Sequence, residues 1–213
     1  EVFDFGPWRF IQYANQNFTA AYFDYNGRYS FGRQPEAALW ALTQLGKSFN
    51  KLINEKRIIE ILNEFSTTFH LSLKRHFCWR IGIQDIDAKS LSEIMNVLLN
   101  ESEKHKIEFA SFFYDFFGGR EAVIDCLKTN YGNKYKVEGF LKITDILKDS
   151  QSSKGALEKR KLINKNRENM LIDEVEQIWE EINKNDNWKL LEKKISKVRK
   201  LGNSLESQKL VNF

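Results

Sequence analysis

The sequence predicts a mostly α-helical protein, and three observations lead to this fold class. The chain has only two prolines and eleven glycines among 213 residues, too few for a turn-dense β-sandwich. Apolar residues recur at spacings of three and four, as they do on one face of an α-helix. A hydrophobic content of 42% is enough to form a buried core, and the nearly balanced charge argues against intrinsic disorder. Because no stretch approaches eighteen uninterrupted apolar residues, we expect no membrane partner and a cytoplasmic location.

The first 34 residues are expected to be irregular, because they are rich in aromatic residues, glycine and asparagine. Helices are expected from Pro35 onward, since proline at the first helical position loses no hydrogen bond. Five apolar stripes with helical spacing follow. They are Ala38-Leu42-Leu45-Phe49, Ile58-Leu62-Phe65-Phe69, Leu91-Ile94-Met95-Leu98, Phe109-Phe112-Phe113-Phe116-Phe117 and Val123-Leu127-Tyr131.

Local signals refine three of these helices. The second helix is predicted to continue toward residues 77–79. The third is predicted to begin at Ser90, because Glu93 three residues later completes the pattern of a capping box. The phenylalanine stripe is interpreted as a buried core face that ends at Gly118-Gly119, since glycine adopts the left-handed conformation at a helix end.

The chain is predicted to divide into residues 1–150 and a basic helical extension, residues 151–213. The polar run 148–155 is the candidate linker between them. The extension has two further apolar stripes that flank Asn185-Asp186-Asn187, which predicts a helical hairpin. These stripes are Val175-Ile178-Trp179-Ile182 and Trp188-Leu191-Ile195-Val198.

The net charge of +4 resides in the extension, which has fourteen Lys and Arg against ten Asp and Glu. Clustered basic residues are typical of nucleic-acid surfaces, and such a surface is one interpretation. The charges alternate in sign, however, and they flank an apolar stripe. We therefore favour a solvated helix face and expect no nucleic-acid partner.

The histidines and cysteines carry no recognisable catalytic or metal-binding pattern. His70, His76 and His105 lack the spacing to one another, to cysteines or to carboxylates that a zinc site requires. We interpret His70 as a packed or hydrogen-bonded core residue. Cys78, beside Phe77 and Trp79, is interpreted as a small apolar core residue, and two cysteines do not make a disulfide scaffold.

One short segment suggests chemistry. In Phe3-Asp4-Phe5-Gly6-Pro7 an aspartate follows an apolar run and precedes an aromatic residue and a glycine. This is the local form of the segment in which kinases hold Mg²⁺ on the nucleotide phosphates. Farther along come Phe18-Thr19-Ala20-Ala21-Tyr22-Phe23-Asp24 and Gly27-Arg28-Tyr29-Ser30-Phe31-Gly32-Arg33-Gln34-Pro35-Glu36-Ala37, and then Leu39-Trp40. Together these segments resemble the selenoprotein O family, the SelO/YdiU-type proteins, densely over residues 3–45. Residues 170–176 and 186–188 resemble the C-terminus of a bacterial branch of the family.

The resemblance implies the lower, C-terminal lobe of a protein-kinase-like fold with a helical extension, without the upper lobe. It implies a bacterial protein adenylyltransferase that transfers AMP from ATP to Ser, Thr or Tyr hydroxyls of proteins. Asp4 would be the ligand of Mg²⁺ or Mn²⁺ and so part of the ATP site. The family's remaining catalytic residues lie upstream of this position, so no catalytic residue is expected in this chain. We therefore expect the chain alone to be inactive.

Two questions stay open at the level of sequence. Arg9, Arg28 and Arg33 could contact phosphate or substrate, or they could tie the irregular arm to the helices through carboxylates such as Asp24 and Glu36. The chain could also be a non-catalytic helical interaction module descended from the enzyme. An exposed apolar face is expected in either case.

Overall fold

A computed structural model describes residues 11–20 and 24–205 of the protein. Within these residues the chain forms α-helices, two short 3₁₀-helices (η1 and η2) and two isolated β-bridges, but no β-strand. The prediction of a mostly helical protein is confirmed for this part. The elements are η1 (Phe31–Arg33), α1 (Gln34–Ser48), α2 (Glu55–Asn63), α3 (Phe65–Ile81), α4 (Ala88–Glu101), α5 (Phe109–Asp115), α6 (Arg120–Leu127), η2 (Tyr131–Tyr135), α7 (Glu138–Lys148), α8 (Ala156–Lys165), α9 (Ile172–Asn185) and α10 (Lys189–Leu205).

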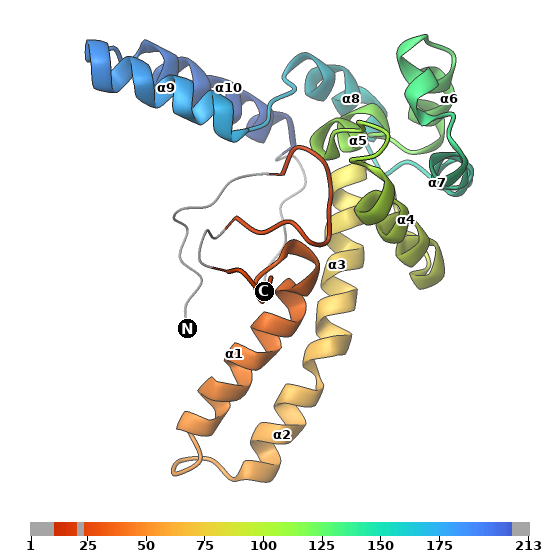
Figure 1. The fold of residues 1–213 in the computed structure, drawn as a ribbon. Helices are drawn as coiled ribbons and strands as arrows, with labels where there is room; N and C mark the ends of the chain where they lie inside the picture. The colour runs from red at the N-terminus through yellow and green to blue at the C-terminus, as the bar shows by residue number, and fades with distance from the viewer. Residues whose placement is uncertain (1–10, 21–23, 206–213) are drawn as a thin grey trace.

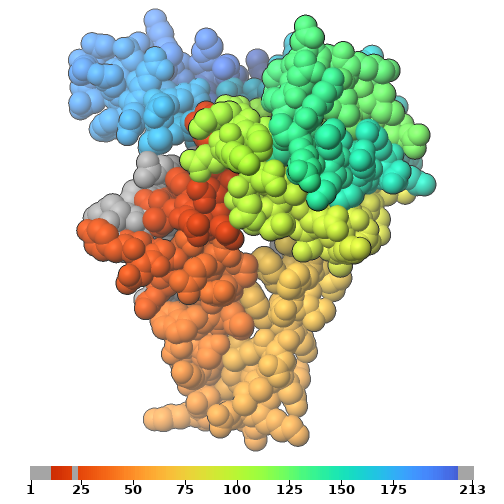
Figure 2. Space-filling model, turned by 45° about the vertical axis from the view of Figure 1, so that its right-hand side comes forward, coloured from red at the N-terminus to blue at the C-terminus, as the bar shows by residue number. Residues whose placement is uncertain are grey.

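The helices form three regions, which Figure 1 shows. Helices α1 and α2, with the first half of α3, project as a leg, and α3 continues from the leg into a compact group formed by α4 to α8. The hairpin of α9 and α10 extends from this group on another side. In the space-filling view the arm before α1 lies above the leg and beside the α5 region (Figure 2).

The start of the leg follows the sequence signals closely. Pro35 occupies the first turn of α1, as predicted. The second stripe, however, is divided between two helices, because α2 ends and α3 begins on either side of Glu64. The backbone of Glu64 stays in the right-handed helical region. The apolar residues of α2 and α3 therefore keep nearly the spacing of one continuous helix. Helix α3 then runs to Ile81, slightly beyond the predicted continuation.

The N-terminus of α4 differs from the prediction. The helix begins at Ala88, and the cap is Asp87, whose carboxylate accepts a hydrogen bond from the backbone N–H of Ser90 at 3.0 Å. Ser90 is therefore the third helical residue and not the cap. A carboxylate caps as well as a hydroxyl and also interacts favourably with the positive end of the helix dipole, which explains why the start lies earlier.

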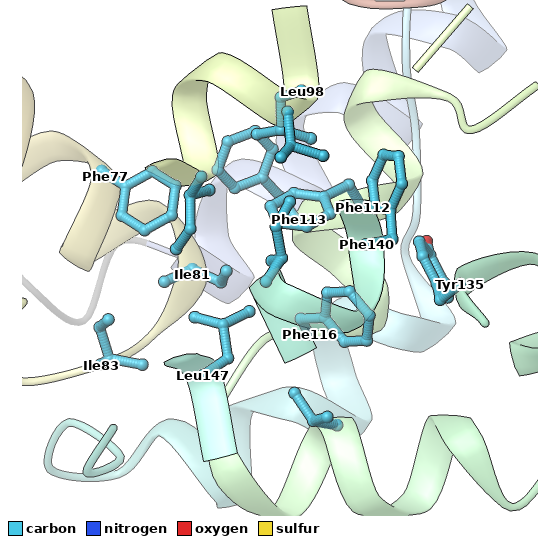
Figure 3. Close-up of a cluster of buried hydrophobic side chains, with 14 of the residues drawn as sticks. Phe77, Ile81, Ile83, Leu98, Phe112, Phe113, Phe116, Tyr135, Phe140 and Leu147 are labelled. Atoms are coloured by element: carbon cyan, nitrogen blue, oxygen red, sulfur yellow. The ribbon is translucent and has the colours of Figure 1, made fainter. Parts of the chain in front are cut away.

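The main core lies where α3, α4, α5 and α7 meet (Figure 3). The prediction that the phenylalanine stripe is a core face is confirmed: Phe112 and Phe116 are fully buried, and Phe113 and Phe117 nearly so. The rings of Phe112 and Phe116 pack edge to face at 5.2 Å, and Tyr135 packs against Phe116 at 4.5 Å. The helix itself ends at Asp115, before the two glycines, and the stripe continues into the following turn.

Two glycines allow this turn to lie close to the end of α3. Gly82 has a φ of +71°, and a Cβ there would lie 3.0 Å from the Phe117 ring. Gly118, with a φ of +103°, donates its N–H to the carbonyl of Ile81 at 2.8 Å. Residues 151–153 also contact this turn, because the Ser152 hydroxyl donates a hydrogen bond to the carbonyl of Gly118 at 2.6 Å. The predicted linker 148–155 is thus a loop between α7 and α8 that is anchored to the core.

The predicted C-terminal hairpin is present as α9 and α10, which turn at Asp186 in the left-handed conformation. Its base is held by a buried lysine: Lys194 forms ion pairs with Glu168 at 3.1 Å and with Glu174 at 2.5 Å. The fifth predicted stripe is only partly helical, because α6 ends at Leu127 and Tyr131 is half-exposed in η2. Among the described residues, no helix combines the length and apolar character needed to cross a bilayer.

Candidate functional site

The segment that the sequence singles out, Phe3-Asp4-Phe5-Gly6-Pro7, lies outside the described residues, and so does Arg9. The structure therefore describes the site from the arm that follows, residues 11–20 and 24–33. Of the segments on which the family resemblance rests, this arm carries residues 18–20, 24 and 27–33. Its folding shows what holds the chain from residue 11 onward.

Asp24 organises the arm. Its carboxylate accepts hydrogen bonds from the backbone N–H groups of Arg28 at 2.8 Å and Tyr29 at 2.7 Å, and from the Thr19 hydroxyl at 3.3 Å. The Tyr29 N–H contributes most to lowering the pKa of Asp24, the bonds from Arg28 and Thr19 add to it, and desolvation opposes it. Gly27, with a φ of +61°, allows the chain to turn back over the carboxylate. Asp24 thus stabilises a closed loop by binding its backbone.

The arm is fastened to the helical body by backbone hydrogen bonds. The N–H of Gly32 donates to the Gln16 carbonyl at 2.8 Å, and the N–H of Phe109 donates to the Gln12 carbonyl at the same distance. Gly32 must lack a side chain here, because a Cβ would lie 2.8 Å from the Cβ of Gln16. The rings of Phe31 and Phe109 pack edge to face at 6.1 Å. These contacts place the arm against the start of α5.

Of the three arginines whose role the sequence left open, Arg28 and Arg33 lie within the described residues. Arg28, Arg33 and Trp40 line a shallow cavity of about 340 Å³ together with Tyr29, Glu36 and Ala37. The Nε of Arg33 pairs with Glu36 at 3.1 Å, as one of the two interpretations predicted. Arg28 is bound to Asp24 through its backbone N–H. Its exposed guanidinium forms no ion pair within the described residues.

The other chemically reactive residues are structural. Cys78 and Cys126 are buried, and burial raises the pKa of each thiol to about 11, so neither is a reactive thiolate. His70 is exposed and not in the core, and its Nδ1 donates to the Ser66 carbonyl at 2.6 Å. In residues 11–20 and 24–205, no group of three His, Cys, Asp or Glu side chains could hold a metal ion.

Sequence reasoning missed a buried ionic cluster around Asp115. Its carboxylate, 2% exposed, accepts hydrogen bonds from the Tyr135 hydroxyl at 2.5 Å and from Nη1 of Arg167 at 2.6 Å. Lys134 lies 3.3 Å away. Burial raises the pKa of Tyr135, and the Asp115 charge adds to the effect, so the phenol stays protonated as a donor. An aspartate inside the phenylalanine stripe was the available signal, since a carboxylate there requires partners.

Comparison with known proteins shows which class of protein this chain resembles. The chain is similar to proteins named "Protein nucleotidyltransferase YdiU". The relative from *Trichormus variabilis* is 30% identical over 115 residues, which cover 54% of this chain and 24% of that protein. The *Synechocystis* relative is 42% identical over 69 residues (32% and 14%), and the *Vibrio cholerae* relative is 29% identical over 132 residues (59% and 26%). The matches thus span about a quarter or less of the length of these curated relatives.

The family described as "Protein adenylyltransferase SelO" matches residues 1–199. This range includes the Asp4 segment, the arm and the helices through most of α10. The chain belongs to this family.

Proposed function

We propose that this chain is the C-terminal part of a protein adenylyltransferase that transfers AMP from ATP to Ser, Thr or Tyr hydroxyls of proteins. The family match over residues 1–199 carries the proposal. In this reaction the hydroxyl oxygen forms a bond to the α-phosphorus, the bond to the leaving pyrophosphate breaks, and the hydroxyl proton passes to a base. The helices would form the lower lobe of a kinase-like fold.

Asp4 would supply one carboxylate to Mg²⁺ or Mn²⁺, and the bound cation would neutralise charge on the phosphates. The arm would contribute by fixing the chain from residue 11 onward. Asp24 closes its loop, and the backbone bonds of Gly32 and Phe109 attach it to α5. A rigid support of this kind favours catalysis, because a ligand carboxylate must be held in a narrow range of positions.

The exposed side of α1 is compatible with a role as one part of a longer protein, and equally with the interaction module. The predicted apolar stripe of this helix is not buried within the described residues: Leu42, Leu45 and Phe49 are 40%, 54% and 39% exposed. Contiguous exposed apolar side chains are typical of surfaces that contact another part of a protein. We infer that residues of the longer protein cover this side, and that the 213-residue chain alone does not transfer AMP.

The role of Asp4 can be tested in a protein that carries this sequence together with the upstream residues expected from the family. The protein is incubated with Mn²⁺ and ATP labelled at the α-phosphate. We expect Asp4→Ala to reduce label transfer to protein at least ~100-fold, because charge stabilisation at the phosphates is lost. Asp149→Ala, an exposed aspartate after α7, is the matched control and should transfer label normally.

Equal labelling by the wild type and the Asp4→Ala variant would contradict the assignment of Asp4. No labelling by the wild type would contradict the proposed activity itself. It would leave the helical interaction module as the better interpretation, with the exposed side chains of α1 and of the α9–α10 hairpin as its surface.

A further inference from the structure

A second, larger cavity lies behind the arm. It has a volume of about 740 Å³ and is bounded by the arm, α3, α5, the segment between α8 and α9, and the last turns of α10. This volume lies within the range of small-molecule sites. Most of the wall is apolar and strongly aromatic. It includes Phe18, Phe31, Phe77, Phe109, Phe113 and Met170.

One cationic side chain belongs to this wall. Arg80, near the end of α3, has its guanidinium carbon 4.7 Å from the centre of the Tyr114 ring and 5.3 Å from that of Phe113. No carboxylate in the described part of the chain forms an ion pair with Arg80. Its Nη1 is shielded from solvent and has no hydrogen-bond partner there. Burial lowers the pKa of Arg80, and the interaction of its side chain with Tyr114 opposes this effect.

The acidic group of the same wall does not compensate this charge. The Glu168 carboxylate is bound by Lys194 at 3.1 Å and Lys197 at 3.4 Å. The Tyr114 hydroxyl is also engaged, since it donates to the backbone carbonyl of Glu168 at 2.5 Å. His76 lies one helical turn before Arg80 on α3 and lines the cavity beside it. The cavity thus combines an apolar wall with a cation that lacks an anionic partner.

We propose that this cavity binds an apolar monocarboxylate of the fatty-acid type. The carboxylate would pair with Arg80, and the hydrocarbon would lie against the aromatic wall. A partly buried cation gains free energy when an anion approaches it, and an apolar body gains free energy by leaving water. A strongly hydrated polyanion such as a nucleotide does not fit this wall. Binding here would not depend on AMP transfer, since only the cavity wall and Arg80 take part.

The proposal is tested by calorimetric titration of the 213-residue chain with laurate, below the concentration at which laurate forms micelles. We expect one laurate per chain. The Arg80→Met variant should bind about tenfold or more weakly, because it keeps an unbranched apolar stem but removes the charged guanidinium. Arg75→Met, on an exposed turn of the same helix, is the matched control and should bind as the wild type does.

Two further measurements keep the test independent of any folding defect in Arg80→Met. The Ala110→Trp variant adds volume to the wall and should abolish binding, with circular dichroism confirming its helix content. Dodecanol has the same hydrocarbon chain without the charge and should bind the wild type at least about tenfold more weakly than laurate. Absence of laurate binding, equal binding of laurate and dodecanol, or unchanged binding by Ala110→Trp would overturn the proposal.

Discussion

At the scale of single residues, Asp115 shows how a buried charge fastens distant parts of the chain together. It connects α5 to Tyr135 in η2 and to Arg167 between α8 and α9. The carboxylate is almost completely buried, whereas Arg167 keeps about a third of its side chain exposed. Removing the carboxylate would leave a buried hydroxyl without its acceptor and a partly buried guanidinium without its counter-ion.

We expect Asp115→Ala to lower the free energy of unfolding by about 2–3 kcal/mol, less than for a fully buried pair because Arg167 retains solvent contact. Urea denaturation followed by circular dichroism measures this change. The matched control is Asp125→Ala, which breaks the ion pair with Arg160 from a carboxylate that is 60% exposed. Asp125→Ala should lower the free energy of unfolding by less than about 1 kcal/mol. Equal effects of the two variants would contradict the structural role of Asp115.

At the scale of elements, the arm depends on the ionised form of Asp24. The backbone N–H of Tyr29 and then that of Arg28 lower the pKa of this carboxyl below its ordinary value of 3.8. A carboxylate with a lowered folded-state pKa stabilises the protein above its unfolded pKa. That stabilisation is lost as the pH falls through the folded value.

The Asp24→Asn variant should therefore be less stable than the wild type at pH 7, and the difference should shrink below about pH 4. Thermal unfolding at pH 7 and pH 3 measures both differences. Asp149→Asn, whose side chain is exposed, provides the control for the loss of a surface charge. A difference between wild type and Asp24→Asn that stays constant over this range would contradict the argument.

The elements also show how far sequence reasoning reaches. Helical spacing predicted the existence of the helices, because the 3.6-residue period is a local property. It did not predict the break at Glu64, since the backbone stays nearly helical there, nor the cap at Asp87, which competed with a plausible capping box. Of the candidate site, the pairing of Arg33 with Glu36 agrees with one of the two interpretations that the sequence left open. The cavity beside Arg80 was not, because it requires segments far apart in the sequence to meet.

At the scale of the whole molecule, the chain belongs to the SelO family over residues 1–199, while its matches span at most about a quarter of the curated relatives cited above. Two features of the structure bear on the proposal that this chain is one part of a longer protein. The arm is attached to the start of α5 by backbone hydrogen bonds, and the side of α1 is apolar and exposed.

Under the proposed function the longer protein transfers AMP and not phosphate, and the intact mass of an acceptor protein distinguishes these two reactions. A protein that carries this sequence with the upstream residues is incubated with Mn²⁺, ATP and the acceptor, and the acceptor is then weighed by mass spectrometry. The 213-residue chain alone serves as the control and should leave the acceptor unchanged. A gain in mass equal to one AMP group is the predicted result, and a gain equal to a phosphate group would contradict it.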